Sequence, residues 1–150
     1  MTDAEANEVK RVLWKYRDAR ERLIMAWQRL ETARAALTGV TIDYSKDRVQ
    51  TSPVSYDKTG EMVDEIAKME AEHLQAAREY LAIMREVQVL IDGVKDARLH
   101  ELLCRRYILR QGFEQIAYEM SYDYRHIRRL HKKALALVWE EIGGSKNEIR

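Results

Sequence analysis

The stretch that decides the fold covers residues 98–139 and reads RLHELLCRRYILRQGFEQIAYEMSYDYRHIRRLHKKALALVW. It predicts a helix over residues 113–120, a three-residue turn at 121–123, and a second helix that continues to about residue 142. Two helices joined by so tight a turn are typical of a helix-turn-helix unit. Because the chain has 46% hydrophobic and 34% charged residues and a single proline, we expect the whole fold to be all-α.

The residues around the turn are of the types that such a unit requires. Ala117 is the small residue where the two helices cross, next to the apolar Ile116, and Tyr122 is an apolar plug in the turn. Asp123 is placed to cap the second helix, because its carboxylate can accept a hydrogen bond from an orphan backbone amide. Ser121 occupies a position that usually takes a left-handed backbone conformation, at a cost of roughly 1 kcal/mol.

The second predicted helix has two chemically different faces. Apolar residues recur there at spacings of three and four and predict a buried stripe, formed by Ile127, Leu130, Ala134 and Leu137. Four cations with the same kind of spacing fall on nearly the opposite face, at about 100° per residue: Arg125, Arg128, Arg129 and Lys132. A helix with one apolar and one cationic face is suited to enter the major groove of double-stranded DNA. The alternative is a surface helix with a solvated charge face.

The run FEQIAYEMSYDYRHIRRLHKKAL at residues 113–135 resembles region 4 of bacterial sigma factors, which reads promoter DNA. The likeness rests on IAxxM, a cap residue and the pattern xxxIRRLxxKAL. The whole chain is similar to the RinA/ArpU-like late-transcription regulators of phages and prophages, which combine a long helical N-terminal half, a Ser/Thr-rich linker and a sigma-region-4-like unit with an RRYI-like segment, here residues 105–108. The resemblance is specific in the last third of the chain and architectural before it. Ser121 departs from the pattern, because glycine is frequent at that position.

The resemblance also implies roles for residues of the cationic helix. It implies contacts to base edges by Tyr124, Arg125 and Arg129. Contacts to phosphates, or else solvated charge, are expected for Arg128, Lys132 and Lys133. His126 either contacts DNA or is exposed, and His131 is structural or faces solvent.

The function implied by the resemblance is that of a sequence-specific DNA-binding transcriptional regulator. It would be encoded by a phage, act on phage gene expression in the cytoplasm of the bacterial host, and have host RNA polymerase as a further candidate partner. Two alternatives stay open. One is a small terminase-like subunit that packages DNA, and the other is a sigma-like adaptor that binds RNA polymerase.

The N-terminal half of the chain predicts a long helical hairpin. Residues 2–5 can form a capping box, and an apolar heptad seam over residues 9–37 predicts one continuous helix that ends at residues 38–39. A second seam of the same length covers residues 62–90. Equal seams favour an antiparallel, coiled-coil-like hairpin, with parallel and intermolecular pairing left open.

Residues that end or cap helices divide the chain into three expected parts. Asp92-Gly93 ends the hairpin, and Asp96 caps a helix that faces inward through Leu99, Leu102, Leu103 and Tyr107. The parts are the hairpin at 1–93 with a linker at 39–60, the sigma-region-4-like DNA-binding domain at 94–144, and a disordered tail at 145–150 that follows a stop at Gly143-Gly144.

The apolar surface of the predicted hairpin is wider than one seam. Trp14 falls on the back of the first helix, where a two-helix hairpin would leave it exposed. Such a wide stripe indicates a second neighbour, either the C-terminal unit folding back or a second subunit. We favour a homodimer, because a two-fold protein can read two half-sites.

Charge and motifs narrow the functional classes. Residues 1–97 hold 15 Lys/Arg against 18 Asp/Glu, and residues 98–150 hold 11 against 7, so the basic surplus lies with the expected DNA-binding domain. The motifs GxxxxGK[ST], GxSxG and GxGxxG are absent, so we expect no enzyme and no cofactor. His100 and Cys104 alone are too few for a zinc site, so no metal is expected. No segment approaches the ~20 apolar residues of a membrane span, and the single cysteine fits a reducing cytoplasm.

Overall fold

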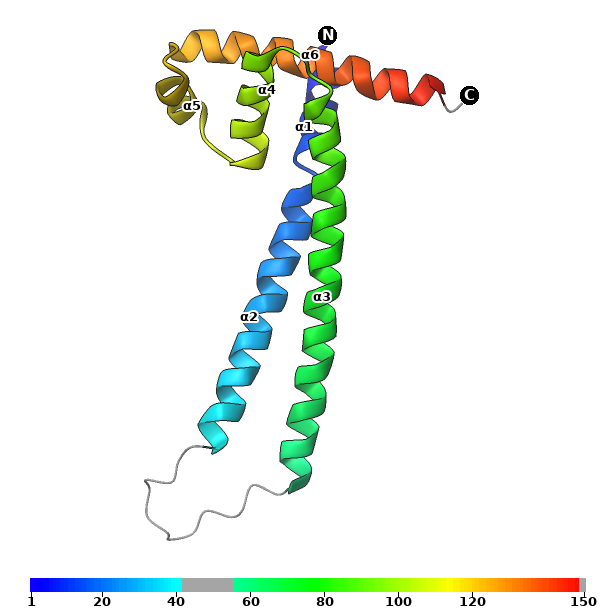
Figure 1. Ribbon diagram of the computed structural model, residues 1–150, viewed down its shortest axis with the longest axis vertical. Coiled ribbons are helices and arrows are strands. Elements are labelled where there is room, and N and C mark those ends of the chain that lie inside the picture. Colours follow the sequence, from blue (N-terminus) through cyan, green and yellow to red (C-terminus); the bar gives the residue numbers. More distant parts are fainter. Residues whose placement is uncertain (42–55, 149–150) are drawn as a thin grey trace. The chain divides into compact units, whose positions relative to one another are not determined.

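The computed structural model describes residues 1–41 and 56–148, and every element within them is helical (Figure 1). The all-α fold predicted from the sequence is confirmed. In chain order the elements are α1 (Asp3–Leu13), α2 (Tyr16–Thr41), α3 (Tyr56–Asp92), α4 (Ala97–Leu103), the π-helical turn η1 (Cys104–Ile108), α5 (Phe113–Met120) and α6 (Tyr124–Glu148).

Contacts divide the chain into two compact units. Residues 17–82 form the first, here called the hairpin unit. Residues 1–16 and 83–150 form the second, here called the composite unit because it joins both ends of the chain. This grouping differs from a division at residue 93, because α1 and the end of α3 belong with the C-terminal helices.

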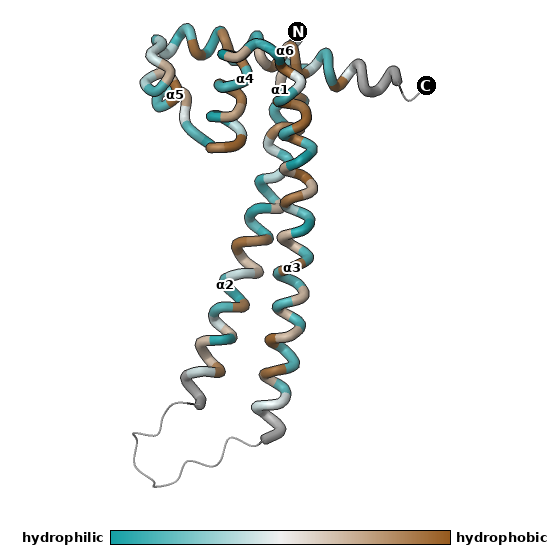
Figure 2. The backbone as a smooth tube through the Cα atoms, viewed as in Figure 1, coloured by the Kyte–Doolittle hydropathy of each residue, from teal (hydrophilic) through white to brown (hydrophobic). Residues whose placement is uncertain are grey.

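Within the hairpin unit α2 and α3 run antiparallel, side by side (Figure 1). Arg22 pairs with Glu79 at 3.9 Å and Arg34 pairs with Glu70 at 3.0 Å. Residues later in α2 therefore lie beside residues earlier in α3, as in an antiparallel pair. Hydrophobic and hydrophilic residues interleave along both helices (Figure 2). The predicted seam is confirmed in this unit, because its members are all buried or half-buried: Ala19, Leu23, Ala26, Leu30, Ala33, Leu37, Met62, Ile66, Met69, His73, Ala76 and Tyr80.

The prediction of one continuous first helix is wrong, because α1 ends at Leu13 and α2 begins at Tyr16. The break has a physical reason. The Trp14 ring lies 4.8 Å from the Tyr107 ring, and the Tyr16 hydroxyl donates a hydrogen bond to the Tyr107 carbonyl. Residues two apart on a continuous helix do not face the same neighbour, so both contacts require the turn at residues 14–15.

Three helix ends also differ from the prediction. The second helix of the chain, α2, continues to Thr41, beyond the expected end at 38–39, and α3 begins at Tyr56, inside the expected linker. Residues 42–55 of that linker lie outside the described residues. At the other end, α6 continues through Gly143 and Gly144 to Glu148, although each glycine costs about 1 kcal/mol in a helix interior. The first four residues of the expected tail are therefore helical, and residues 149–150 are not described.

The core of the composite unit lies under α6, which packs against α1, α4 and α5. Val9 and Leu13 of α1 and Ile91 of α3 are fully buried there. The expected supporting helix is confirmed, since its four inward-facing residues are buried and the Asp96 carboxylate accepts hydrogen bonds from the backbone amides of Arg98 and Leu99. Trp14, which a two-helix hairpin alone would leave exposed, is half-buried. For Trp14 the second neighbour is thus the C-terminal part of the same chain, the first of the two alternatives.

Among the helices of residues 1–41 and 56–148, none combines the length and the apolar character needed to cross a membrane.

Candidate nucleic-acid interface

The turn between α5 and α6 has the backbone conformation expected from the sequence. Ser121 has φ 57° and ψ 40°, which is the left-handed region. Its amide donates to the Tyr118 carbonyl at 3.2 Å, and the Tyr122 amide donates to the Ala117 carbonyl at 2.9 Å. These two bonds form a Schellman motif that satisfies the last carbonyls of α5. The half-buried Tyr122 ring also lies 4.9 Å from the His126 ring, so the turn is tied to α6.

The start of α6 is capped as expected. The Arg125 amide donates to the Asp123 carboxylate at 3.0 Å, and the Ile127 amide donates to the Asp123 carbonyl at 3.0 Å. Ile116 and Ala117 of α5 are buried against α6. The cap and the small crossing residue together fix the direction in which the first turns of α6 leave the unit.

The buried face of α6 follows the prediction at three of four positions. Ile127, Leu130 and Ala134 are buried, but Leu137 is 36% exposed, so its place in the stripe was wrong. The stripe instead includes His131, Leu135 and Val138. The buried stripe is shifted because α1 covers the side of α6 that carries His131 and Leu135. The apolar spacing of α6 alone cannot predict that α1 packs there.

The opposite face of α6 is accessible. Six of the seven candidate DNA-binding residues are exposed: Tyr124, Arg125, Arg128, Arg129, Lys132 and Lys133. The seventh, His126, is half-buried against Tyr122. All five cations of the candidate site therefore share the solvent side of the first three turns of α6.

One of these cations is held in place by aromatic rings. The Arg128 guanidinium lies 5.0 Å from the centre of the Phe113 ring and 5.9 Å from that of Tyr124. Its Nη1 also donates to the Tyr124 hydroxyl at 3.5 Å. Stacking leaves the N–H groups at the edge of the guanidinium plane available, so Arg128 remains able to bind an anion.

Sequence reasoning missed one cation of this surface, Lys10 of α1. Lys10 lines a groove between α1 and α6 together with Arg128, Lys132 and Lys133, and the acidic member of the lining is Asp3. Nothing in the spacing of residues 1–13 marks Lys10 as different from a solvated lysine. The indirect signal was Trp14, whose position off the seam showed that α1 needed a second packing partner.

Two arginines of η1, Arg105 and Arg106, form their contacts inside the composite unit. Arg105 binds Glu101 at 2.8 Å and also binds Glu119 of α5. The Arg106 guanidinium stacks over Phe113 at 4.4 Å and donates to the Gln111 carbonyl at 3.0 Å. Both side chains therefore connect η1 to α5 and to the turn before it.

Behind the cationic face lies the buried His131. Its Nε2 is 2.8 Å from the Tyr107 hydroxyl. Burial, reinforced by the positive charges of Lys10, Arg106 and Arg128, lowers the pKa of His131 to about 3. The imidazole is therefore neutral near pH 7 and shares a hydrogen bond with the Tyr107 hydroxyl. Burial also raises the pKa of Tyr107, which keeps that hydroxyl protonated.

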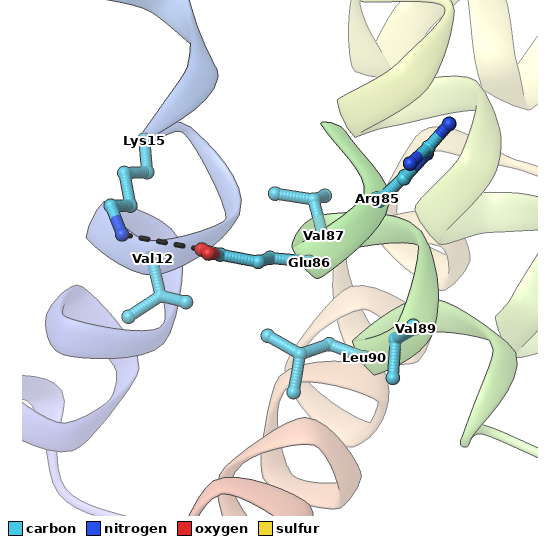
Figure 3. A pocket seen from close by; sticks show the side chains of 7 residues that line it. All are labelled: Val12, Lys15, Arg85, Glu86, Val87, Val89 and Leu90. Carbon is cyan, nitrogen blue, oxygen red and sulfur yellow. Dashed lines mark hydrogen bonds and ion pairs between the residues drawn. The ribbon is translucent and has the colours of Figure 1, made fainter. Parts of the chain in front are cut away.

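Two further features within residues 1–41 and 56–148 lack this set of cations. A second groove is lined by apolar residues of α1 and α3, and the ion pair between Lys15 and Glu86 at 3.3 Å crosses it (Figure 3). The Cys104 sulfur lies 3.8 Å from His100 Nδ1, while His100 Nε2 lies 2.9 Å from Asp92. Within the part of the chain that the structure describes, no three such side chains are arranged to hold a metal ion.

Comparison of the chain with protein-family models, with curated proteins and with solved structures found no match.

Proposed function

We propose that the protein is a sequence-specific DNA-binding transcriptional regulator that reads the major groove with the first half of α6. The observation that carries the proposal is the exposure of five cations on one face of α6, opposite a buried stripe. Tyr124 is exposed at the start of the same helix, and that start is fixed by the α5 turn and the Asp123 cap. A recognition helix needs this combination, because its first turns must project from a rigid support into the groove.

The proposed contacts divide into two kinds. Tyr124, Arg125 and Arg129 read base edges, and a good bidentate arginine contact to guanine contributes about 1–3 kcal/mol of discrimination. The remaining contacts are to phosphates and position the protein without reading sequence, and they come from Lys10, Arg128, Lys132 and Lys133. Lys10 extends the phosphate surface from α6 onto α1, since both helices line one groove.

The resemblance of residues 113–135 to sigma region 4 supports a role in transcription within this proposal. The similarity of the whole chain to RinA/ArpU-like regulators extends it to a phage or prophage protein that acts on phage genes in a bacterial cytoplasm. Host RNA polymerase is then the second partner that the proposal implies.

Selection of bound duplexes from a random pool, followed by sequencing and repeated at two salt concentrations, tests the proposal. We expect one enriched motif that survives the higher salt. With that motif in hand, Arg125→Ala and Arg129→Ala should lower affinity for the motif more than for unrelated DNA. Lys132→Ala and Lys10→Gln should lower affinity equally on both and reduce the salt slope by about 0.9 each.

Lys15→Gln is the matched control for the phosphate contacts. It removes the same charge from the same unit, but Lys15 is paired with Glu86 away from the α1–α6 groove, so its salt slope should not change. Weak binding without a motif, lost at higher salt in every variant alike, would refute the proposal. Circular dichroism of each variant checks that the helices are retained.

A further inference from the structure

The hairpin unit carries large apolar side chains that neither of its helices covers. Trp27 is 47% exposed, Val63 is 50%, Leu74 is 51% and Leu81 is 55%. Each retains about half of its surface in water, whereas the seam residues between the helices are buried or half-buried. Among the residues of the hairpin unit with described burial, only Ala19 and Leu30 belong to the fully buried core.

Three of these side chains share one side of α3. Val63, Leu74 and Leu81 are separated by eleven and then seven residues. At about 100° per residue these steps return to the same direction within roughly 20°. The three residues therefore form a stripe along α3 that is distinct from the seam. Glu70, seven residues after Val63, lies on the same side.

Trp27 lies on the matching side of α2, so the two sides form one continuous face. Arg34 is seven residues after Trp27 and shares its direction by the same argument. Arg34 binds Glu70 of α3 at 3.0 Å, which joins the two sides. The Trp27 ring also lies 5.3 Å from the ring of His73, the neighbour of Leu74. We call this surface, made of Trp27, Val63, Leu74 and Leu81, the apolar face.

Exposed apolar surface of this kind marks an interaction site, because its burial releases free energy that two helices alone cannot obtain. The distribution of charge indicates the partner. Residues 17–41 hold five Lys/Arg and three Asp/Glu, so α2 is basic in this unit. Residues 56–82 hold three Lys/Arg and seven Asp/Glu, so α3 is acidic. A surface with one basic and one acidic helix is complementary to a copy of itself.

We propose that the apolar face binds a second copy of the chain, with α2 of each protomer on α3 of its partner. A two-fold axis parallel to the helices produces this pairing and gives a four-helix arrangement in which neighbouring helices are antiparallel. The other two-fold arrangement would place α2 on α2 and α3 on α3, and would bring like charges together. This homodimer is independent of DNA binding, although it would carry two copies of α6.

Mass measured by light scattering across a range of concentrations tests the association. We expect twice the chain mass of 17.7 kDa at high concentration. Leu74→Gln and Leu81→Gln should each raise the dissociation constant of the dimer by roughly tenfold. The matched control is Met25→Gln, because Met25 is 49% exposed but lies two residues from Trp27, about 200° away around α2. A monomer at every concentration, a larger ring, or equal loss in the Met25 control would overturn the proposal.

A charge-reversed pair of variants tests the arrangement. In the proposed dimer Leu74 faces the basic α2 of the partner, so Leu74→Lys should weaken the dimer more than Leu74→Glu. If α3 faced the acidic α3 of the partner, Leu74→Glu would be the more damaging change. An equal or reversed effect overturns the α2-on-α3 pairing. Since Leu74 is half exposed in one copy, both variants should keep the helicity of the wild type.

Discussion

Acidification should destabilise the composite unit through one side chain, His131. The folded state keeps His131 neutral, because burial and the nearby charges of Lys10, Arg106 and Arg128 lower its pKa to about 3. In the unfolded chain the pKa of His131 returns to its ordinary value of 6.5. Between pH 3 and pH 6.5 the unfolded state therefore binds a proton that the folded state does not. The stability present above pH 6.5 is lost as the pH falls through this window.

The size of the effect follows from the linkage between proton binding and folding. One proton corresponds to a slope of up to about 1.36 kcal/mol per pH unit. Between pH 7.5 and pH 5.0 only the 1.5 units below 6.5 contribute fully, which gives a loss of roughly 2 kcal/mol.

Urea unfolding at pH 7.5 and pH 5.0 measures the loss. A background with Trp27→Phe and Trp139→Phe leaves Trp14, whose ring lies 4.8 Å from Tyr107, as the fluorescent reporter of the composite unit. His131→Gln removes the titrating group and can still accept a hydrogen bond from Tyr107. The free energy of unfolding of the parent minus that of the variant should fall by about 2 kcal/mol on acidification. His126→Gln, at a half-buried position near the start of the same helix, is the control.

In the difference between parent and variant, the contributions of all other titrating groups to the free energy of unfolding cancel. If the difference between parent and His131→Gln is the same at both pH values, then His131 is not held neutral in the folded state. The packing of His131 against Tyr107 would then be wrong, and with it the way in which α6 is anchored to η1.

Four further changes test the left-handed residues, the α4 cap and the α5–α6 crossing. Ser121→Gly should raise the free energy of unfolding by about 1 kcal/mol, because Ser121 is in the left-handed region, and Arg110→Gly, at φ 58°, should act in the same direction. Asp96→Ala should lower it by about 1 kcal/mol through loss of the α4 cap, again measured by urea unfolding. Ala117→Leu should cost about 1–3 kcal/mol by overpacking the α5–α6 crossing, and should also weaken DNA binding in a shift assay because α6 is displaced.

Local patterns were sufficient to predict the helix-turn-helix unit. The bounds of α5, the left-handed Ser121 and the Asp123 cap depend on contacts within a few residues, and all were confirmed. The opposite faces of α6 followed from its periodicity for the same reason. Leu137 was wrongly placed in the buried stripe because Leu137 and Val138, three and four residues after Ala134, fit the apolar spacing equally well. Only the position of a neighbouring helix decides between them.

The break at residues 14–15 depends on distant contacts and was missed for that reason. The apolar spacing continues through Val12, Tyr16 and Ala19, so the pattern alone predicts one helix. The turn exists because both Trp14 and Tyr16 contact Tyr107, about ninety residues later in the chain. The packing of α1 against α6 likewise depends on distant residues and brings Lys10 into one groove with Arg128, which explains why Lys10 was not among the predicted DNA contacts.

Tryptophans that fall off the seam are informative in this chain. Trp14 lies off the seam, and its surface is covered by η1 and the guanidinium of Arg106, elements that a hairpin alone does not contain. Trp27 also lies off the seam, and it remains 47% exposed although its ring lies 5.3 Å from the His73 ring. A heptad seam accounts for the residues between two helices, so a large apolar residue outside it requires a third surface. For Trp14 that surface is the C-terminal part of the same chain. For Trp27, on a face whose charges match a copy of itself, the same reasoning leads to the partner protomer.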